Sequence, residues 1–424
     1  MKALIRPSKI NGEVNAPSSK SMMQRACALA VLNNGTTHIL HPGNCKDAAA
    51  ALQIVKDLGA LVLESDQEII IKSTGNIYPA SVINFKESGL CSRMFVPIIS
   101  LSNQKTLVQA EGTLLSRPLV YPSELFSLLH TKITTSNGQF PVEIQGPLMP
   151  ADITIDGSQS SQFLTGLLFS FASAVQKPVV ITVNNLVSKP YIDLSIQLLH
   201  HFGYVVTHEA YQYFTIHPVK KIARDIIIDI EGDWSNAAFL MVAAALAGEI
   251  MIKGLDMQSK QADKSIYTVM KNCGAKIVLT EQGIRISKTD EIVAFEFDAT
   301  DCPDLFPPLV CLASFCKGTS VIKGVSRLIH KESNRAESLC TVFGKMGTHL
   351  WIENNAMKIE GNQHHTAGEV SAHNDHRIAM AAAVAGLAGK GELTILGAEA
   401  VDKSFPEFYN TLMKIGGSVS LIKE

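Results

Sequence analysis

Hydrophobic and polar positions along the chain recur in one order. A Gly or Lys precedes a short run of β-branched residues, as in GTTHIL from residue 35 or GEIMIKG from residue 248. A polar loop follows, and apolar residues then return at the 3.6-residue spacing of a half-buried helix, as in AAALQIVKDLGA at 49–60. A glycine and a second strand-like run close the unit. The pattern predicts alternating strands and amphipathic helices, as in an α/β protein.

The unit occurs six times at nearly constant spacing. Its Gly or Lys stands at 35, 105, 177, 248, 318 and 391, so that successive copies start 70 to 73 residues apart. Solenoid repeats are usually shorter, roughly 20–45 residues, so these units are more typical of β-α-β modules within larger domains. Five predicted helices end in glycines suited to the left-handed conformation: DLGALVL (57–63), HFGYVV (201–206), NCGAKIVL (272–279), KMGTHLWI (345–352) and KIGGSVSL (414–421).

Three units precede residue 228 and three follow it. The stretch RDIIIDIEGDWSNAAF (224–239) predicts a strand that leads into a capped helix, and it is a candidate crossing between the halves. Two similar halves imply a cleft between two domains, which is a common place for a ligand.

Composition narrows the class of protein. The 424 residues are 46% hydrophobic and 18% charged, with a net charge of −2, as expected of a soluble globular chain with two or three domains. No basic excess indicates a nucleic-acid partner. The start, MKALIRPSKINGEV, lacks a signal-peptide core, and the longest apolar stretch, IAMAAAVAGLAG (378–389), is too short to span a membrane. We expect a cytoplasmic protein without membrane or nucleic-acid partners.

The eight cysteines predict neither disulfides nor a metal site. They form no C-x-x-C pair and no metal-like spacing with histidines. Most lie in apolar surroundings, where a free cysteine packs as a small hydrophobe, and one reactive thiol is the alternative. HNDH (373–376) could supply two metal ligands, but a third is lacking, so we expect no metal.

Cationic and hydroxyl side chains concentrate where predicted strands lead into helices. Each cluster alone could be a helix cap or a solvated surface charge. Their recurrence at helix N-termini, which favour anions, indicates a shared anion site instead. In the first half these residues are Lys20, Ser21, Arg25, Arg93, Arg117, Ser160, Ser161, Gln162, Ser188 and Tyr191. In the second half they are Asp304, Lys331, Glu332, Arg335, His376, Arg377 and Lys403.

So many cations would repel one another unless a polyanionic ligand lay among them. Arg pairs bidentately with carboxylate or phosphate, and Lys adds a point charge, so the implied ligands are small, phosphorylated and carboxylated. Asp304 and Glu332 are candidate proton carriers, because a carboxylate among cations stays ionised. Lys20 and Ser21 follow no glycine-rich loop, and no dinucleotide fingerprint is present, so neither ATP hydrolysis nor hydride transfer is indicated.

The motifs that carry these residues resemble those of the 5-enolpyruvylshikimate-3-phosphate (EPSP) synthase family of enolpyruvyl transferases. The resemblance runs through SSKSMMQRA, GLCSR, SRPL, DGSQSSQFLTGLL, SKPYID, EGDWSNAAFL, HKESNRAES, NDHRIAMA and DKSFPEF. It implies a two-domain inside-out α/β barrel built from six β-α-β-α-β-β repeats, with the ligand cleft between the domains. It further implies a first domain at 14–227, mainly on the shikimate 3-phosphate side. The second domain, mainly on the phosphoenolpyruvate side, would be 1–13 plus 228–424.

The resemblance implies transfer of the enolpyruvyl group of phosphoenolpyruvate to the 5-hydroxyl of shikimate 3-phosphate, on the pathway to chorismate and aromatic amino acids, without a cofactor. Asp304 would accept the hydroxyl proton, and Glu332 or Lys20 would protonate C3. At matching positions, shikimate 3-phosphate would be bound by Lys20, Ser21, Arg25, Ser160, Ser161, Gln162, Ser188, Tyr191, Asp304 and Lys331. Phosphoenolpyruvate would be bound by Lys20, Gly89, Arg93, Arg117, Gln162, Arg335, His376, Arg377 and Lys403.

The chain departs from the common pattern of that family at several positions. Residues 87–93 read ESGLCSR in place of NAGTAMR, which puts Glu87 beside an anion site, where it would point away or pair with an arginine. Gly89 keeps the small residue associated with sensitivity to the herbicide glyphosate, although its neighbours differ. Arg327 replaces an Asn that often contacts the shikimate phosphate, and Ile329 and Asn334 also differ from the pattern.

Two alternatives stay open. UDP-N-acetylglucosamine enolpyruvyl transferase shares the fold but uses a loop cysteine, where this chain has Ser116 and Arg117. The S-S-Q motif at 160–162 and K-E-x-x-R at 331–335 favour the shikimate substrate. A non-catalytic phospho-ligand-binding relative is the other alternative, because of the substitutions at 87–92. We expect a monomer.

Overall fold

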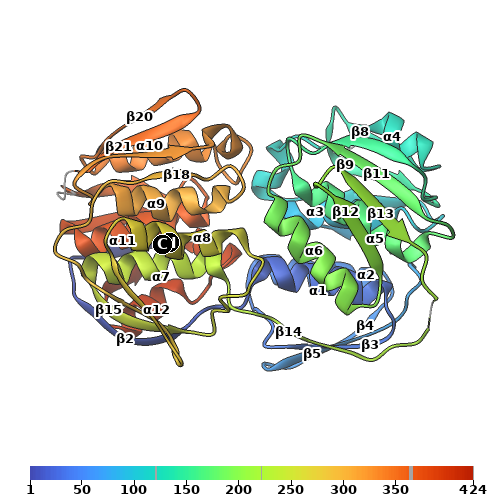
Figure 1. The fold of residues 1–424 in the computed structure, drawn as a ribbon, viewed down its shortest axis with the longest axis horizontal. Helices are drawn as coiled ribbons and strands as arrows, with labels where there is room; N and C mark the ends of the chain where they lie inside the picture. Colours follow the sequence, from blue (N-terminus) through green and yellow to red (C-terminus); the bar gives the residue numbers. More distant parts are fainter. Residues whose placement is uncertain (120–121, 221, 362–365, 424) are drawn as a thin grey trace. The chain divides into compact units, whose positions relative to one another are not determined.

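The computed structural model describes residues 1–119, 122–220, 222–361 and 366–423. Two compact units can be distinguished (Figure 1). Unit 1 comprises Met1–Pro17 and Glu231–Glu424, and unit 2 comprises Ser18–Ile230. The chain therefore passes from one unit to the other twice, after Pro17 and after Ile230.

All sheets share one strand order. The described residues form six four-stranded sheets, in which a parallel pair is followed by two antiparallel strands. The sheets of unit 2 are β14 (Ile226–Asp229), β3 (Asn34–Leu40), β5 (Glu68–Thr74) and β4 (Leu61–Glu64); β6 (Val82–Asn84), β7 (Thr106–Gln109), β9 (Gln139–Gln145) and β8 (Lys132–Ser136); and β10 (Ile153–Asp156), β11 (Val179–Asn184), β13 (Tyr213–His217) and β12 (Val205–Glu209). The sheets of unit 1 are β2 (Ile10–Asn15), β15 (Gly248–Lys253), β17 (Gly283–Ser287) and β16 (Lys276–Thr280); β18 (Glu296–Asp298), β19 (Gly318–Lys323), β21 (Ala356–Gly361) and β20 (His349–Glu353); and β22 (Thr366–Ser371), β23 (Lys390–Leu396), β1 (Lys2–Arg6) and β24 (Ser418–Ile422).

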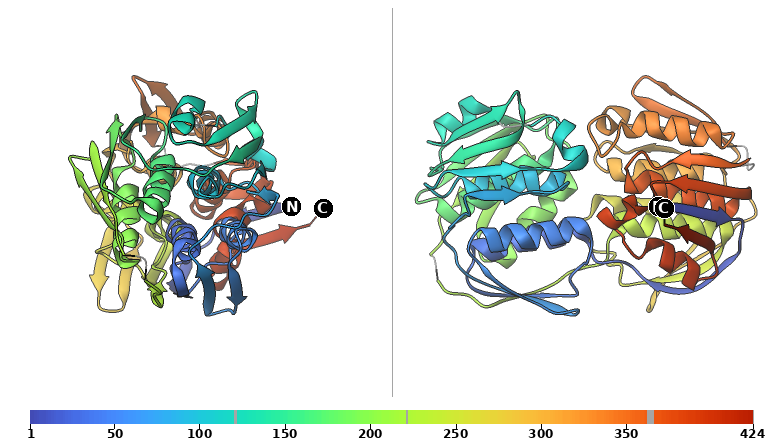
Figure 2. Two further views of the ribbon diagram at one scale, coloured as in Figure 1. Left: turned by 90° about the vertical axis from the view of Figure 1, so that its right-hand side faces the viewer. Right: turned by 180° about the vertical axis from the view of Figure 1, so that it is seen from behind.

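The two crossings exchange the first strands of two repeats. β2 pairs in parallel with β15 of unit 1, although the helix that follows β2 belongs to unit 2. β14 pairs in parallel with β3 of unit 2, although the helix that follows β14 belongs to unit 1. β1 lies between β23 and β24 and completes the last repeat, so that the two ends of the chain lie side by side (Figure 2).

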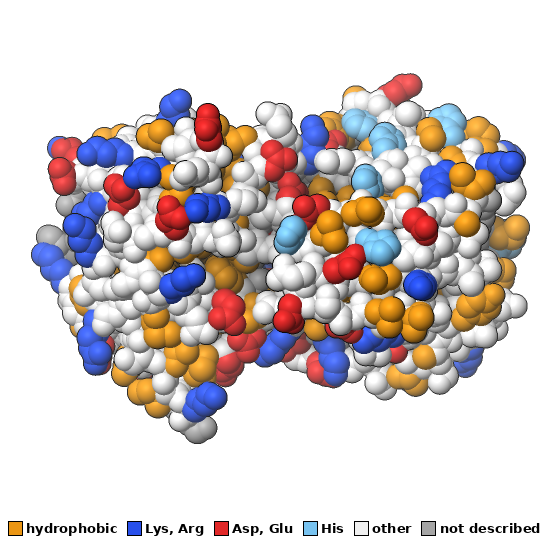
Figure 3. Space-filling view, turned by 90° about the horizontal axis from the view of Figure 1, so that it is seen from below, with side chains coloured by type: hydrophobic (Ala, Val, Ile, Leu, Met, Phe, Trp, Pro, Cys, Tyr) orange, Lys and Arg blue, Asp and Glu red, His pale blue; other side chains and the backbone are white. Residues whose placement is uncertain are grey.

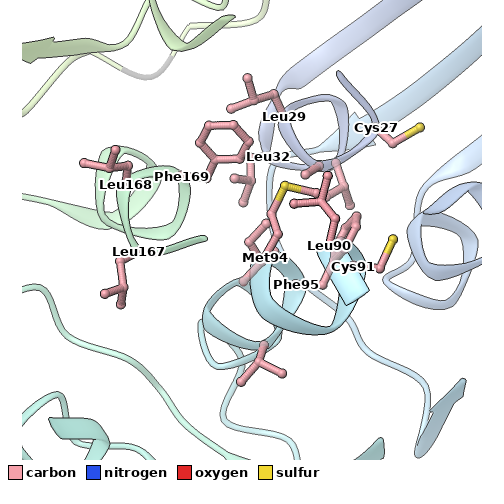
Figure 4. Packing of buried hydrophobic residues seen from close by; sticks show 14 of the residues in the cluster. Cys27, Leu29, Leu32, Leu90, Cys91, Met94, Phe95, Leu167, Leu168 and Phe169 are labelled. Atoms are coloured by element: carbon pink, nitrogen blue, oxygen red, sulfur yellow. The ribbon is translucent and has the colours of Figure 1, made fainter. Parts of the chain in front are cut away.

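The first helix of each repeat forms the interior of its unit. In unit 2, α1 (Lys20–Leu32), α3 (Gly89–Ile99) and α5 (Ser161–Ala174) pack against one another. Figure 4 shows Leu29 and Leu32 of α1 beside Met94 of α3 and Phe169 of α5. In unit 1, α7 (Trp234–Ala247), α9 (Phe306–Ala313) and α11 (His376–Ala388) pack in the same way. These helices are apolar on nearly all sides, as is typical of fully buried helices, and each buried Leu or Phe contributes roughly 1.5–3 kcal/mol.

The second helices of the repeats are shorter or more amphipathic, as the apolar spacing predicts. They are α2 (Lys46–Asp57), α4 (Ser123–Leu128), α6 (Lys189–His201), α8 (Ser265–Asn272), α10 (Arg335–Lys345) and α12 (Phe408–Lys414). Left-handed glycines end five of them, because Gly59, Gly203, Gly274, Gly347 and Gly416 have φ between 78° and 95°. The strand that follows starts two residues after each glycine, so the prediction of these helix ends is confirmed. After α4 the same place is taken by His130, with φ 59°, which no sequence signal indicated.

Charged side chains of both signs are mixed on the surface (Figure 3), and most cysteines are buried. Figure 3 shows Lys and Arg interspersed with Asp and Glu over the face that it draws. All eight cysteines lie in the described residues and outside any disulfide; seven are buried, and Cys340 is partly exposed. In the described parts of the chain, no helix is long and apolar enough to cross a membrane. Nor do the described His, Cys, Asp and Glu side chains form a group of three that could hold a metal ion.

Candidate active site

The N-terminus of α1 presents the Lys and Ser that the sequence indicated. Ser19 caps the helix, because its hydroxyl accepts from the backbone N–H of Met22 at 3.3 Å. Lys20 and Ser21 then occupy the first turn. The Nζ of Lys20 donates to Oδ2 of Asp47 at 2.9 Å, and the Lys20 side chain is only 16% exposed. The first helix of unit 2 thus begins with an ammonium group that Asp47, on α2, holds in place.

Arg25 lies one turn along the same helix face as Ser21, as their four-residue spacing predicts. Its Nη1 donates to the carbonyl and hydroxyl oxygens of Ser21, both at 2.9 Å, and its Nε donates to Oγ of Ser195 at 2.9 Å. The guanidinium lies 5.8 Å from the ring centroid of Tyr191. Burial lowers the pKa of Arg25 to about 10, partly opposed by Tyr191, so Arg25 is charged at neutral pH.

Two further arginines converge on Gly89, the first residue of α3. The Nη1 of Arg93 donates to the carbonyl oxygen of Gly89 at 3.0 Å and to Oε1 of Gln162 at 3.3 Å. Arg117 follows the 3₁₀ helix η1 (Gly112–Ser116) in the extended conformation expected before a proline. A Cβ added to Gly89 would lie 2.9 Å from Nη1 of Arg117 and 3.1 Å from Nη1 of Arg93. Gly89 therefore leaves the space that both guanidinium groups occupy.

The predicted serines stand at the N-termini of α5 and α6. Ser160 caps α5 by accepting from the backbone N–H of Gln162 at 3.2 Å, and Ser161 is the first helical residue. Ser188 precedes α6 in the left-handed conformation, with φ 57°. Because backbone N–H groups at a helix N-terminus favour anions, these hydroxyls lie where a phosphate would be stabilised.

In unit 1, Asp304 is the centre of a cationic cluster. It lies in the 3₁₀ helix η3 (Pro303–Leu305), and its Oδ1 accepts from Nη1 of Arg335 at 2.7 Å. Its Oδ2 accepts from Nη2 of Arg377 at 3.1 Å, and the Nζ of Lys331 lies 3.5 Å from Oδ1. Burial alone would raise the pKa of Asp304, but Arg377, Lys331 and Arg335 hold that pKa well below its usual range. Asp304 is therefore ionised, as expected from the sequence.

Arg335 is bound by three carboxylates. Besides Asp304, its Nη2 donates to Oε2 of Glu332 at 2.6 Å, and its Nε donates to Oδ2 of Asp375 at 2.8 Å. Burial alone would lower the pKa of Arg335, but Asp375, Glu332 and Asp304 together raise it. Oε1 of Glu332 lies 4.0 Å from the Nζ of Lys403, at the end of the 3₁₀ helix η5 (Ala398–Lys403).

His376 and Arg377 open α11, as predicted, and both side chains are buried. Asp375 caps that helix by accepting from the backbone N–H of Arg377 at 3.0 Å. Nδ1 of His376 lies 3.7 Å from Oδ1 of Asp375. One carboxylate thus fixes both the start of α11 and the guanidinium of Arg335.

The spacing of Lys331 and Arg335 is typical of two residues on one helix face, but the structure does not place them so. Lys331 and Arg335 are four residues apart, but α10 begins only at Arg335, so they do not share a helix face. Both instead approach the same oxygen, Oδ1 of Asp304, Lys331 at 3.5 Å and Arg335 at 2.7 Å.

Sequence reasoning missed three partners of the predicted residues: Asp47, Ser195 and Asp375. Asp375 precedes an apolar helix and could have been recognised as an N-cap. Ser195 lies four residues after Tyr191, which is a weak signal on its own. Asp47 lies in the first turn of α2, where an acidic residue is expected for the helix dipole, so nothing in the sequence indicated its role beside Lys20.

Each unit therefore offers one set of charged groups. In unit 2, the predicted residues are cations and hydroxyls at helix N-termini, suited to phosphate and carboxylate. In unit 1, cations surround Asp304 and hold its pKa low, which suits proton transfer next to an anion.

Comparisons with known proteins agree with this chemistry. The family described as EPSP synthase (3-phosphoshikimate 1-carboxyvinyltransferase) matches residues 5–412. A 3-phosphoshikimate 1-carboxyvinyltransferase of Methanocorpusculum labreanum is 35% identical over 423 residues, covering 99% of each chain. That of Clostridium kluyveri is 33% identical over 418 residues, covering 98% of this chain and 97% of the relative. In fold, the chain resembles an EPSP synthase structure from Acinetobacter baumannii, with a TM-score of 0.83 and 24% identity over all of both chains. The chain belongs to the EPSP synthase (3-phosphoshikimate 1-carboxyvinyltransferase) family.

Proposed function

We propose that the chain transfers the enolpyruvyl group of phosphoenolpyruvate to the 5-hydroxyl of shikimate 3-phosphate, releasing phosphate. The hydroxyl oxygen adds to C2 of phosphoenolpyruvate while C3 gains a proton, which gives a tetrahedral intermediate. That intermediate loses phosphate from C2 and a proton from C3, which restores the double bond. The observation that carries the proposal is Asp304, an ionised carboxylate within hydrogen-bond distance of two arginines.

Shikimate 3-phosphate would be bound mainly by residues of unit 2. Ser160, Ser161 and Ser188 stand at helix N-termini, where their hydroxyls and backbone N–H groups suit a phosphate. Ser21 and Arg25, held together at 2.9 Å, offer a hydroxyl and a cation beside Tyr191. Lys20, Gln162, Asp304 and Lys331 complete the proposed set.

Phosphoenolpyruvate would be bound by cations that can grip both its carboxylate and its phosphate. Arg93 and Arg117 meet at Gly89, and their planar guanidinium groups suit a bidentate carboxylate contact. Lys20, Gln162, Arg335, His376, Arg377 and Lys403 are the other proposed contacts. The negative substrate would replace part of the attraction that now ties Arg335 and Arg377 to Asp304.

Two carboxylates and one lysine are the proposed proton carriers. Asp304 would accept the proton of the 5-hydroxyl once a ligand draws its arginine partners away, because its pKa would then rise. Glu332, or Lys20, would deliver the proton to C3. We also propose that the chain acts as a monomer on small-molecule substrates in the cytoplasm.

Phosphate release from phosphoenolpyruvate tests the proposal. The purified chain should release phosphate only when shikimate 3-phosphate is present, with equal amounts of phosphate and EPSP formed. UDP-N-acetylglucosamine should not replace shikimate 3-phosphate. Phosphate release that is independent of both acceptors, or supported by UDP-N-acetylglucosamine alone, would overturn the assignment.

A further inference from the structure

The guanidinium of Arg117 is held by a chain of two hydrogen bonds that ends on Glu87. Nη2 of Arg117 donates to Oγ1 of Thr113 at 3.0 Å, and Oγ1 of Thr113 donates to Oε2 of Glu87 at 3.2 Å. The backbone N–H of Thr113 points to the same Oε2 at 3.4 Å. Because an ionised carboxylate can only accept, the Thr113 hydroxyl directs its hydrogen to Glu87 and its lone pair to Arg117. The hydroxyl is therefore fixed in one orientation.

The backbone around Glu87 and Thr113 is fixed by other contacts. The N–H of Glu111 donates to the carbonyl oxygen of Lys86 at 2.9 Å, and their side chains form an ion pair at 2.7 Å. Glu87 also lies tightly over Gly112, whose φ is 52°, because a Cβ there would lie 2.2 Å from Oε1 of Glu87. The loop that carries Arg117 is thus attached to the residues that immediately precede α3.

The guanidinium of Arg117 has little room to move. Its side chain is buried, and its Nη1 lies against Gly89, beside the Nη1 of Arg93. A rotation of the guanidinium would remove the alignment of the two arginines around Gly89. The bond from Nη2 to Thr113 fixes that rotation from the other side of the same group.

We propose that Glu87 is a positioning residue for phosphoenolpyruvate binding, which acts through Thr113 on the orientation of Arg117. The inference rests on the proposed contact between Arg117 and phosphoenolpyruvate. It assigns a role to an acidic residue next to an anion site, where its charge alone would disfavour the ligand. Glu87 directs its charge to the start of η1 and to the Thr113 hydroxyl, and so orders the cation that meets the substrate.

Steady-state kinetics of Thr113→Val and Glu87→Ala test the inference. Both variants should raise the KM for phosphoenolpyruvate by roughly three- to tenfold, the loss expected for one hydrogen bond to a charged group. The KM for shikimate 3-phosphate should stay within twofold of the wild-type value. Thr113→Ser keeps the hydroxyl and should restore the wild-type KM. Because the two residues act in series, the double variant should cost no more than the larger single effect.

Two controls separate the possible failures. Ser116→Ala, in the same 3₁₀ helix, removes an exposed hydroxyl that donates to the local carbonyl of Thr113 at 3.1 Å, and it should leave both KM values unchanged. Arg117→Ala tests the proposed contact itself. If Arg117→Ala leaves the KM for phosphoenolpyruvate unchanged, the proposed role of Arg117 is wrong. If Arg117→Ala raises that KM while Thr113→Val and Glu87→Ala do not, the positioning role of Glu87 is wrong.

Discussion

Nε of Arg335 donates to Oδ2 of Asp375 at 2.8 Å, and both side chains are almost completely excluded from solvent. Asp375 also caps α11. Removing one member of a buried ion pair is strongly destabilising, because the remaining charge stays buried. Asp375→Ala should therefore lower the free energy of unfolding by roughly 3–5 kcal/mol. Asp375→Asn keeps a capping oxygen and should recover only the roughly 1 kcal/mol of the cap. Urea unfolding of both variants measures the difference, and equal stability of Asp375→Asn and the wild type would contradict the ion-pair argument.

Asp304→Ala should reduce kcat by roughly 10²–10⁴-fold, as expected when a general base is removed. The KM values should change far less, because several cations remain to bind the anions. Asp298→Ala is the matched control. Asp298 is an exposed carboxylate whose Oδ1 accepts from the backbone N–H of Thr300 at 2.9 Å. Its kcat should match that of the wild type. A near-normal kcat in Asp304→Ala would rule out Asp304 as the base.

Gly89→Ala should weaken phosphoenolpyruvate binding more than it changes stability. The added Cβ would lie 2.9 Å from Nη1 of Arg117, so at least one guanidinium must move. A displacement of this kind can cost roughly 10²-fold in a positioned site, and we expect the KM for phosphoenolpyruvate to rise roughly tenfold. Gly344→Ala is a control for the residue change alone. No atom lies within 4 Å of a Cβ there, and the helical position should gain roughly 0.5–1 kcal/mol. An unchanged KM in Gly89→Ala would show that the arginines do not need their present positions.

Glu231→Gln should stabilise the folded chain at neutral pH. Burial raises the pKa of Glu231, with Asp256 and Asp233 adding to the rise and hydrogen bonds from Gln261 and Ser259 opposing it. The folded state therefore keeps this proton to a higher pH than the unfolded state. Stability falls as pH rises from the unfolded pKa, near 4.5, through the raised folded pKa.

Thermal unfolding between pH 4 and pH 8 measures this effect. The Tm advantage of Glu231→Gln should grow from near zero at pH 4 to a plateau at neutral pH. The exposed Glu281→Gln should show no such growth. A constant offset in Glu231→Gln across that pH range would mean that the carboxyl is not responsible.

The repeat, its strands and its helix ends could be predicted because they depend on local patterns. The glycines that end five outer helices illustrate this, since the left-handed conformation and the next strand follow from nearby residues. His130 could not be predicted, because a histidine at the same place carries no turn signal, although its backbone N–H donates to the carbonyl of Ser127 at the end of α4 in the structure. A crossing at 224–239 was indicated by the sequence, and the family resemblance implied that the chain before residue 14 belongs to the second domain. The strands with which β2 and β14 pair could not be read from the local pattern, because β15 and β3 are far away in sequence.

In the candidate site, too, arrangements set by local spacing could be predicted, whereas contacts made by the tertiary structure could not. Helical spacing alone predicts that Ser21 and Arg25, four residues apart, share a face, and the proline after Arg117 predicts an extended segment there, as the structure shows. The direction of Glu87 was left open between pointing away and pairing with an arginine, and in the structure Thr113 links its carboxylate to Arg117. Asp47 and Asp375 look like ordinary helix-terminal acids in the sequence, and only the tertiary structure brings them to Lys20 and Arg335.

The exchange of strands has a consequence for the order in which the chain folds. All of unit 2 is one continuous segment, Ser18–Ile230, which can fold as soon as it has been synthesised. Unit 1 must wait, because β2 needs β15 and β1 needs both β23 and β24, where Lys2 pairs with Leu396 and Ile422. The first two strands to be made are thus among the last to be paired. Until then, the backbone N–H and C=O groups of β1 and β2 have no partner strand. Unit 2 is the part of the molecule that can fold first on the nascent chain.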